Sequence, residues 1–202
     1  YTGTTNLNAG TIKVGNDSAL GTGALAMATG TTLDAGAANR TLANAVGITG
    51  TGTVDTNATT LTLSGVVSGG ALTKIDSGTL VLTGTNTYSG TTNLDAGTIQ
   101  VGNSSALGTG ALAMASGTKL QSGAADLTLT NTVAITGAGT RTVDTQANTL
   151  TLGGVVSGDG ALAKTGAGTL TLNGTNTYTG TTNLNAGTIK VGNDSALGTG
   201  AL

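Results

Sequence analysis

The sequence predicts an all-β fold, a parallel β-solenoid of about ten coils with no helices of note, at roughly 20 residues per coil. Three observations predict it: the chain repeats itself, its apolar residues alternate along short segments, and Pro, Cys, Trp, Phe and His are absent. Net charge is only −2 and Leu, Ile and Val recur throughout, so the 36 glycines do not indicate disorder. Collagen is excluded because it needs Pro and a Gly at every third position.

The repeat is long and nearly exact. The segment "YTGTTNLNAGTIKVGNDSALGTGAL" at 1–25 returns unchanged at 178–202, and a close copy begins at Tyr88. The spacings are therefore 88 − 1 = 87 and 178 − 88 = 90 residues. The three extra residues of the second copy fall in Gly-flanked stretches, at 137–145 and 155–162, where turns tolerate insertions. We predict a single continuous β-solenoid over 1–202, made of repeats 1–87 and 88–177 and a partial third repeat 178–202.

Short segments within each repeat show the period-two pattern of strands with one buried face. In "TIKV" at 11–14, Ile12 and Val14 are expected to face inward, and the second copy keeps Ile99 and Val101 in these positions. The other strand-like segments are "ALAMA" at 24–28, "TTLDA" at 31–35, "VGIT" at 46–49, "TLTL" at 60–63 and "GTLVL" at 78–82. The same alternation places Leu80, Leu82, Leu170 and Leu172 inside and Lys13, Gln100 and Lys190 outside. No stretch sustains the apolar period of a helix.

One residue conflicts with this alternation. Lys74 has the inward parity of Leu72, and Lys164 that of Leu162. Either the strand breaks after Leu72, or the lysine lies at a corner and reaches solvent. We expect the corner, because burying an unpaired ammonium is costly.

The residue types present exclude most catalytic chemistry. Without His, Cys or Glu, no Ser/His/Asp or Cys/His nucleophile can be assembled. A pair of carboxylates could serve a glycosidase, but the nine Asp residues are spread singly along the sequence. These are Asp17, Asp34, Asp55, Asp76, Asp95, Asp126, Asp144, Asp159 and Asp194. We predict that the chain is not an enzyme and has no catalytic, cofactor-binding or metal site.

Several motifs admit a functional alternative. "SGDGA" at 157–161 and "VDT" at 54–56 and 143–145 could hold calcium or another metal, but an inserted turn and a strand edge are the simpler interpretations. Asn86 and Asn176 are expected to join a polar ladder at a corner, with ligand contact as the alternative. Tyr88 and Tyr178 are expected to cap a turn with the hydroxyl in water. Threonine rows on one face could bind ice, although that requires coils of identical length.

Charge and hydropathy limit the partners. The seven basic residues are scattered singly, which argues against nucleic acid. They are Lys13, Arg40, Lys74, Lys119, Arg141, Lys164 and Lys190. No run of 18 apolar residues is present, so we predict no membrane span in this segment. Both ends have the sequence of an ordinary repeat rather than of an atypical capping repeat, so we expect a longer array or end-to-end stacking of the chain with itself.

The segment "GALAKTGAGTLTLNGTNTYTGTTNLNAGTIKVGNDSALGTGAL" at 160–202 resembles the autotransporter passenger-associated β-strand repeat. The pattern L-x-K-x-G-x-G-T-L-x-L-x-G-x-N-T-Y-x-G-x-T maps onto it from Leu162 to Thr182, and onto the earlier copy from Leu72, where Asp76 replaces the first Gly. The resemblance implies a right-handed parallel β-helix in a secreted or surface-displayed bacterial protein. It implies no catalytic residue.

Two functions follow from these observations. The repeats, and an expected exterior of Thr, Asn and Gly without a recognisable site, favour a structural, non-catalytic segment of an extracellular or cell-surface bacterial fibre or filament. The resemblance favours the alternative, the passenger or stalk of an autotransporter adhesin that displays a binding region located elsewhere, with other cell-surface components as further partners.

Overall fold

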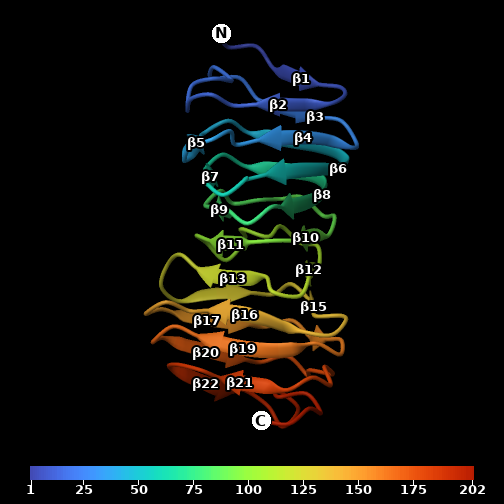
Figure 1. Ribbon diagram of the computed structural model, residues 1–202, viewed down its shortest axis with the longest axis vertical. Coiled ribbons are helices and arrows are strands. Elements are labelled where there is room, and N and C mark those ends of the chain that lie inside the picture. The colour runs from blue at the N-terminus through green and yellow to red at the C-terminus, as the bar shows by residue number, and fades with distance from the viewer.

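The computed structural model describes residues 1–202, and it winds them into a single column of stacked coils with the termini at opposite ends (Figure 1). All 22 regular elements are β-strands, and every pairing between them is parallel. There are about nine turns, close to the ten expected. The predicted fold class, an all-β parallel β-solenoid, is confirmed. No helix that could cross a membrane is present.

Each coil contributes a segment to three faces in a fixed order, and the strands of one face stack on those of the next coil. Face 1 holds β1 (Thr5–Leu7), β3 (Leu25–Met27), the first parts of β6 (Val46–Asp55) and β8 (Val67–Ile75), and then β14 (Leu127–Leu129), β17 (Thr149–Leu152), β20 (Thr169–Leu172) and β22 (Thr188–Val191). Between β8 and β14, hydrogen bonds continue this face through residues 86–89 and 104–109.

The other two faces are uninterrupted. Face 2 holds β2 (Thr11–Lys13), β4 (Thr31–Asp34), the second parts of β6 and β8, β10 (Thr92–Leu94), β12 (Leu112–Met114), β15 (Val133–Ala134) and β18 (Val156–Ser157). Face 3 holds β5 (Arg40–Leu42), β7 (Thr60–Leu63), β9 (Thr79–Leu82), β11 (Thr98–Val101), β13 (Lys119–Ser122), β16 (Thr140–Asp144), β19 (Ala161–Thr165) and β21 (Thr182–Leu184).

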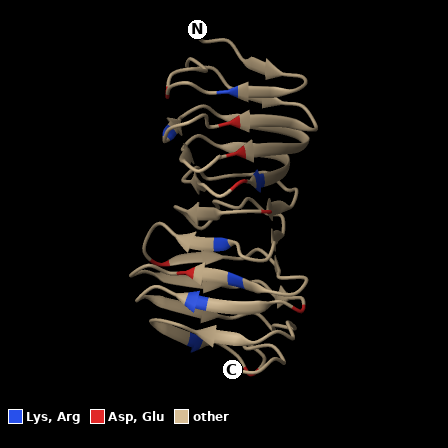
Figure 2. Ribbon diagram, viewed as in Figure 1, with Lys and Arg blue, Asp and Glu red and all other residues tan.

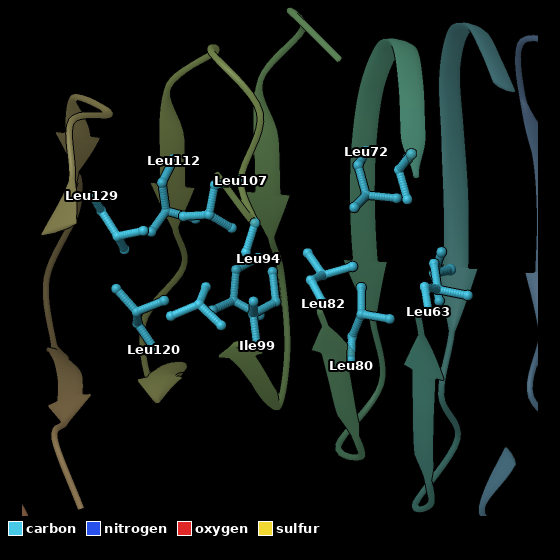
Figure 3. Close-up of a cluster of buried hydrophobic side chains, with 14 of the residues drawn as sticks. Leu63, Leu72, Leu80, Leu82, Leu94, Ile99, Leu107, Leu112, Leu120 and Leu129 are labelled. Carbon is cyan, nitrogen blue, oxygen red and sulfur yellow. The ribbon is translucent and has the colours of Figure 1, made fainter. Parts of the chain in front are cut away.

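The core is one cluster of 39 buried apolar residues, and Figure 3 shows part of it. Leu80, Leu82, Leu170 and Leu172 are fully buried, as predicted. On the outer side, Lys13 and Lys190 are exposed as predicted, whereas Gln100 is half-buried between Val81 and Gln121 on the two adjacent coils. Aliphatic side chains stacked in this way give a core to a chain with almost no aromatic residues.

The corners absorb differences in coil length. Thr79 stacks on Thr98 and Lys119 stacks on Thr142, so the coil that starts at Lys119 is the longer of the two. Two strands, β6 and β8, turn from face 1 onto face 2 without a break. Gly50 and Gly69 lie at these turns with φ of 68° and 97°, a conformation that side chains rarely adopt.

Candidate functional site

Asn86 and Asn176 occupy equivalent corners and connect three consecutive coils, as predicted for polar corner residues. Asn86 is buried; its Oδ1 accepts from the Val67 amide at 2.8 Å and its Nδ2 donates to the Ala106 carbonyl at 2.6 Å. Asn176 repeats this between Val156 and Ala196. Both polar ends of each amide are therefore used inside the protein.

The expectation for the tyrosine hydroxyls is wrong. Tyr88 and Tyr178 are both fully buried, and each hydroxyl shares a hydrogen bond with a threonine, Thr92 at 2.6 Å and Thr182 at 2.7 Å. Burial raises the pKa of Tyr88 to about 12, although the hydrogen bond with Thr92 works in the opposite direction. The two rings are therefore core residues at the corner. The threonine four residues further along the chain supplies a hydrogen-bond partner, so the hydroxyl can be buried together with the ring.

The expectation for Lys74 and Lys164 is also wrong, since both are fully buried and the strand does not break. The Lys74 stem stacks between Val54 and Leu94, within a column of inward side chains. Its ammonium donates to three backbone carbonyls, those of Ile75 at 2.8 Å, Asp76 at 2.5 Å and Ala96 at 3.1 Å. Burial lowers the pKa of Lys74 to about 8, while the charges of Asp76 and Asp55 raise it.

Lys164 forms the same cage with Thr165, Gly166 and Ala186. In both copies the third carbonyl comes from the next coil, so the ammonium fastens one coil to the next. Gly166 has φ of 81°, and Asp76, which stands in its place in the first copy, has φ of 64°. The turn that forms the cage requires this left-handed conformation, which explains a Gly at that position of the motif.

Arg141 is a third inward basic residue, whose role was not expected from the sequence. It is 1% exposed, and its Nε donates to the Met114 carbonyl at 3.0 Å. The two terminal nitrogens donate to the carbonyls of Gly137, Gly139 and Thr136. Its parity with Val143, two positions on, is the signal that could have placed it inside.

The two insertions of the second repeat meet at this corner. The turn that contains Gly137 lies beside the "SGDGA" turn, because β15 pairs with β18, and the Gly137 amide donates to the Asp159 carboxylate. The Asp159 side chain thus closes an inserted turn, which agrees with the simpler interpretation of that motif.

The nine Asp residues are spread singly along the sequence, but two of them are neighbours in space. Asp34 and Asp55 are direct partners on β4 and β6, one coil apart. The Asn57 side chain donates to Asp34 and its backbone amide to Asp55. Asp34 and Asp55 are separated in the sequence by one coil length, and this separation is the signal that could have predicted their contact.

Asp144, in the second "VDT", ends β16 and accepts hydrogen bonds from Gln121 and twice from Gln146. Lys119 lies 3.6 Å from its Oδ2. Burial would raise the pKa of Asp144, but these hydrogen bonds and the Lys119 charge together lower it. Asp55 likewise ends β6, so both motifs lie at strand ends.

The surface has only a few hollows, and these are open to solvent. A polar groove of about 630 Å³ lies beside Lys119, Asp144 and Gln146, and an apolar one of about 410 Å³ lies on the last coil beside Leu184, Ile189 and Val191. No three His, Cys, Asp or Glu side chains are grouped to hold a metal ion. Figure 2 shows acidic and basic residues interspersed along the length of the column.

Comparison with known proteins agrees with this architecture. Residues 1–14, 72–101 and 162–191 match the passenger-associated-transport-repeat family. The chain is 42% identical over 144 residues, 69% of its length, to "Adhesin BmaC autotransporter" of Brucella suis biovar 1 (strain 1330), and spans only 4% of that protein. No solved structure matches significantly. The matched segments contain the caged lysines, Tyr88, Tyr178 and the strands that follow them, and this chain is thus a β-solenoid that carries three matches to the passenger-associated transport repeat.

Proposed function

We propose that this chain is a rigid, non-catalytic stretch of an autotransporter passenger, located on the cell surface or outside the cell, that holds a binding region at a distance. The observation that supports this most is the 42% identity to an autotransporter adhesin across 69% of the chain. The repeat matches and the uninterrupted core agree with a spacer role. The charged groups of Lys74 and Arg141 are engaged in holding coils together, and the Tyr88 hydroxyl is engaged with Thr92 inside its own coil.

Surface location can be tested because the chain has no cysteine. Lys13→Cys places a thiol on an exposed side chain, and Leu80→Cys places one in the core as the matched control. In intact cells that produce the whole protein, a membrane-impermeant maleimide should label the first variant and not the second. Labelling of the first variant only after lysis would contradict the proposal.

A self-associating filament is the second candidate. Leu184 and Val191 on the last coil are 50% and 52% exposed, and they line the apolar hollow described above. In a filament of stacked copies, a second copy would cover them. If copies stack, sedimentation of the purified 202-residue chain should shift to larger species with concentration, and Val191→Lys should abolish the shift. A chain that sediments as a monomer at every concentration would contradict self-association and leave the passenger role as the remaining candidate.

A further inference from the structure

Equivalent segments of successive repeats lie on different faces of the column. The sequence Thr-Asn-Leu occurs as β1, β10 and β21. β1 pairs with β3 on face 1, β10 pairs with β12 on face 2, and β21 pairs with β19 on face 3. The next strand of each repeat, β2, β11 and β22, moves in the same way, from face 2 to face 3 to face 1.

The cause is the number of faces that one repeat visits. From β1, the chain returns to face 1 at β3, β6, β8 and residues 86–89, which makes four coils, and β10, the first strand of the second repeat, then lies on face 2. The second repeat returns to face 2 at β12, β15, β18 and residues 176–179, and β21 follows on face 3. Each repeat is thus four coils and one additional face.

The three inserted residues of the second repeat do not change this count. The insertion before Arg141 and the insertion at Asp159 enlarge corners, while the strands before and after them keep their partners. The number of faces, rather than the number of residues, is therefore what the two repeats share.

We propose that each repeat acts as a one-third-turn spacer: it advances the chain by about 21 Å, at about 4.8 Å per coil, and turns everything after it by one third of a turn. A group borne by the repeat, such as the outward residue at Asn6, Asn93 and Asn183, therefore faces three directions in turn. A flat partner along one side meets that group only at every third repeat, about 62 Å apart.

The junctions permit whole repeats to be gained or lost. Residues 84–87 and 174–177 both read "GTNT", so removing 88–177 joins Thr87 to Tyr178 in an unchanged local sequence. The preceding coil is also equivalent, because β10 rests on Leu72 and Lys74 while β21 rests on Leu162 and Lys164. Loss of one repeat would keep the core continuous and rotate the remainder. The consequence, that repeat number sets the direction of a distal binding region, rests on the proposed passenger role.

Spin-label distances in the intact chain test the rotation. Cysteines introduced at Asn6 and Asn93 lie on faces 1 and 2, whereas a control pair at Asn6 and Thr87 lies on face 1, four coils apart. The distance from 6 to 93 should be clearly longer than that from 6 to 87, and equal to that from 93 to 183. Equal distances for the 6–93 and 6–87 pairs would overturn the proposal.

Deletion tests the spacer itself. In the chain lacking 88–177, Asn183 should lie beside Thr73, as Asn93 does in the full chain. A short bis-maleimide should therefore cross-link Thr73→Cys with Asn183→Cys in the deletion chain and not in the full chain, where Thr73→Cys with Asn93→Cys is the positive control. An unfolded deletion chain, or a folded one without the cross-link, would contradict the proposal. Both tests use purified protein, so their failure leaves the surface-labelling test of the passenger role unaffected.

Discussion

Three basic residues point into the interior, and each ends in a cage of backbone carbonyls. For Lys74, Lys164 and Arg141 the alternation of the sequence predicts the direction of the side chain correctly. The cost of burying a charge predicts the opposite, and for the two lysines that argument led to the wrong expectation. The sequence does not reveal the shape of the turn beside each of these residues. A turn in the left-handed conformation points backbone carbonyls toward the interior, so the charged group is hydrogen-bonded without a carboxylate partner.

Lys74→Met should change how stability depends on pH. Burial lowers the pKa of Lys74 to about 8, from 10.5 in the unfolded chain. Between these values the unfolded state binds more protons, so this residue makes the unfolding free energy rise with pH. Denaturant unfolding from about pH 7.5 to 9.5 should show a shallower rise in the variant, because it lacks this group. Identical slopes for the two proteins would show that the lysine titrates normally.

Leu170→Asp should disrupt the inner column. Leu170 is fully buried between Leu150 and Ile189 on neighbouring coils, and an isolated carboxylate there has no partner. We expect a loss of more than about 3 kcal/mol in unfolding free energy. Lys190→Gln is the control and should be nearly silent, since the second repeat has Gln100 at that position. Thermal unfolding followed by circular dichroism measures both, and a stable Leu170→Asp protein would refute the register.

At the scale of the strands, the alternation of apolar residues predicted which segments form strands and which side faces inward. The structure of the corners was not predicted. "TIKV", "TTLDA", "TLTL" and "GTLVL" appear as β2, β4, β7 and β9 with the expected faces inward. The continuation of β6 through "GTGT" was not predicted, because glycine-rich sequence normally indicates a turn. Here the glycines bend a strand around a corner, and its pairing with the next coil shifts register there and resumes at Thr51.

Arg141→Met should loosen the enlarged corner between β15 and β16. The variant keeps the apolar stem but removes the donors to Met114, Gly137 and Gly139. Buried carbonyls left without donors should lower the unfolding free energy by about 2–4 kcal/mol. Lys119→Thr, a change on the neighbouring strand β13 that restores the residue of the first repeat, should cost less than about 1 kcal/mol. Hydrogen exchange should speed up at Gly137–Arg141 in the first variant only; unchanged exchange there would contradict the role of Arg141.

At the scale of the molecule, the sequence predicted the stacking but not the rotation. A repeat of this length is compatible with four coils or with five, and only the register of the strands shows four coils and one additional face. The same register pairs Asp34 with Asp55 and places Lys119 beside Asp144, contacts that no local pattern encodes. Long-range contacts in this fold depend on coil length, and coil length varies at the corners.

Metal chelation should leave the fold unchanged. The Asp159 carboxylate accepts from the Gly137 amide, and Asp144 is occupied by Gln121, Gln146 and Lys119. The melting temperature with excess EDTA should equal that with calcium. A chelator-dependent fall would show that one of these turns binds a cation.

The central claim is that residues one coil apart in the sequence are neighbours in parallel strands. Nuclear Overhauser effects between backbone protons test it most directly in this 19.1 kDa chain. Contacts are predicted from Ile99 to both Leu80 and Leu120 on the two adjacent coils, and from Leu170 to Leu150 and Ile189. Contacts instead between residues facing each other across short turns, in the pattern of antiparallel hairpins, would contradict the solenoid.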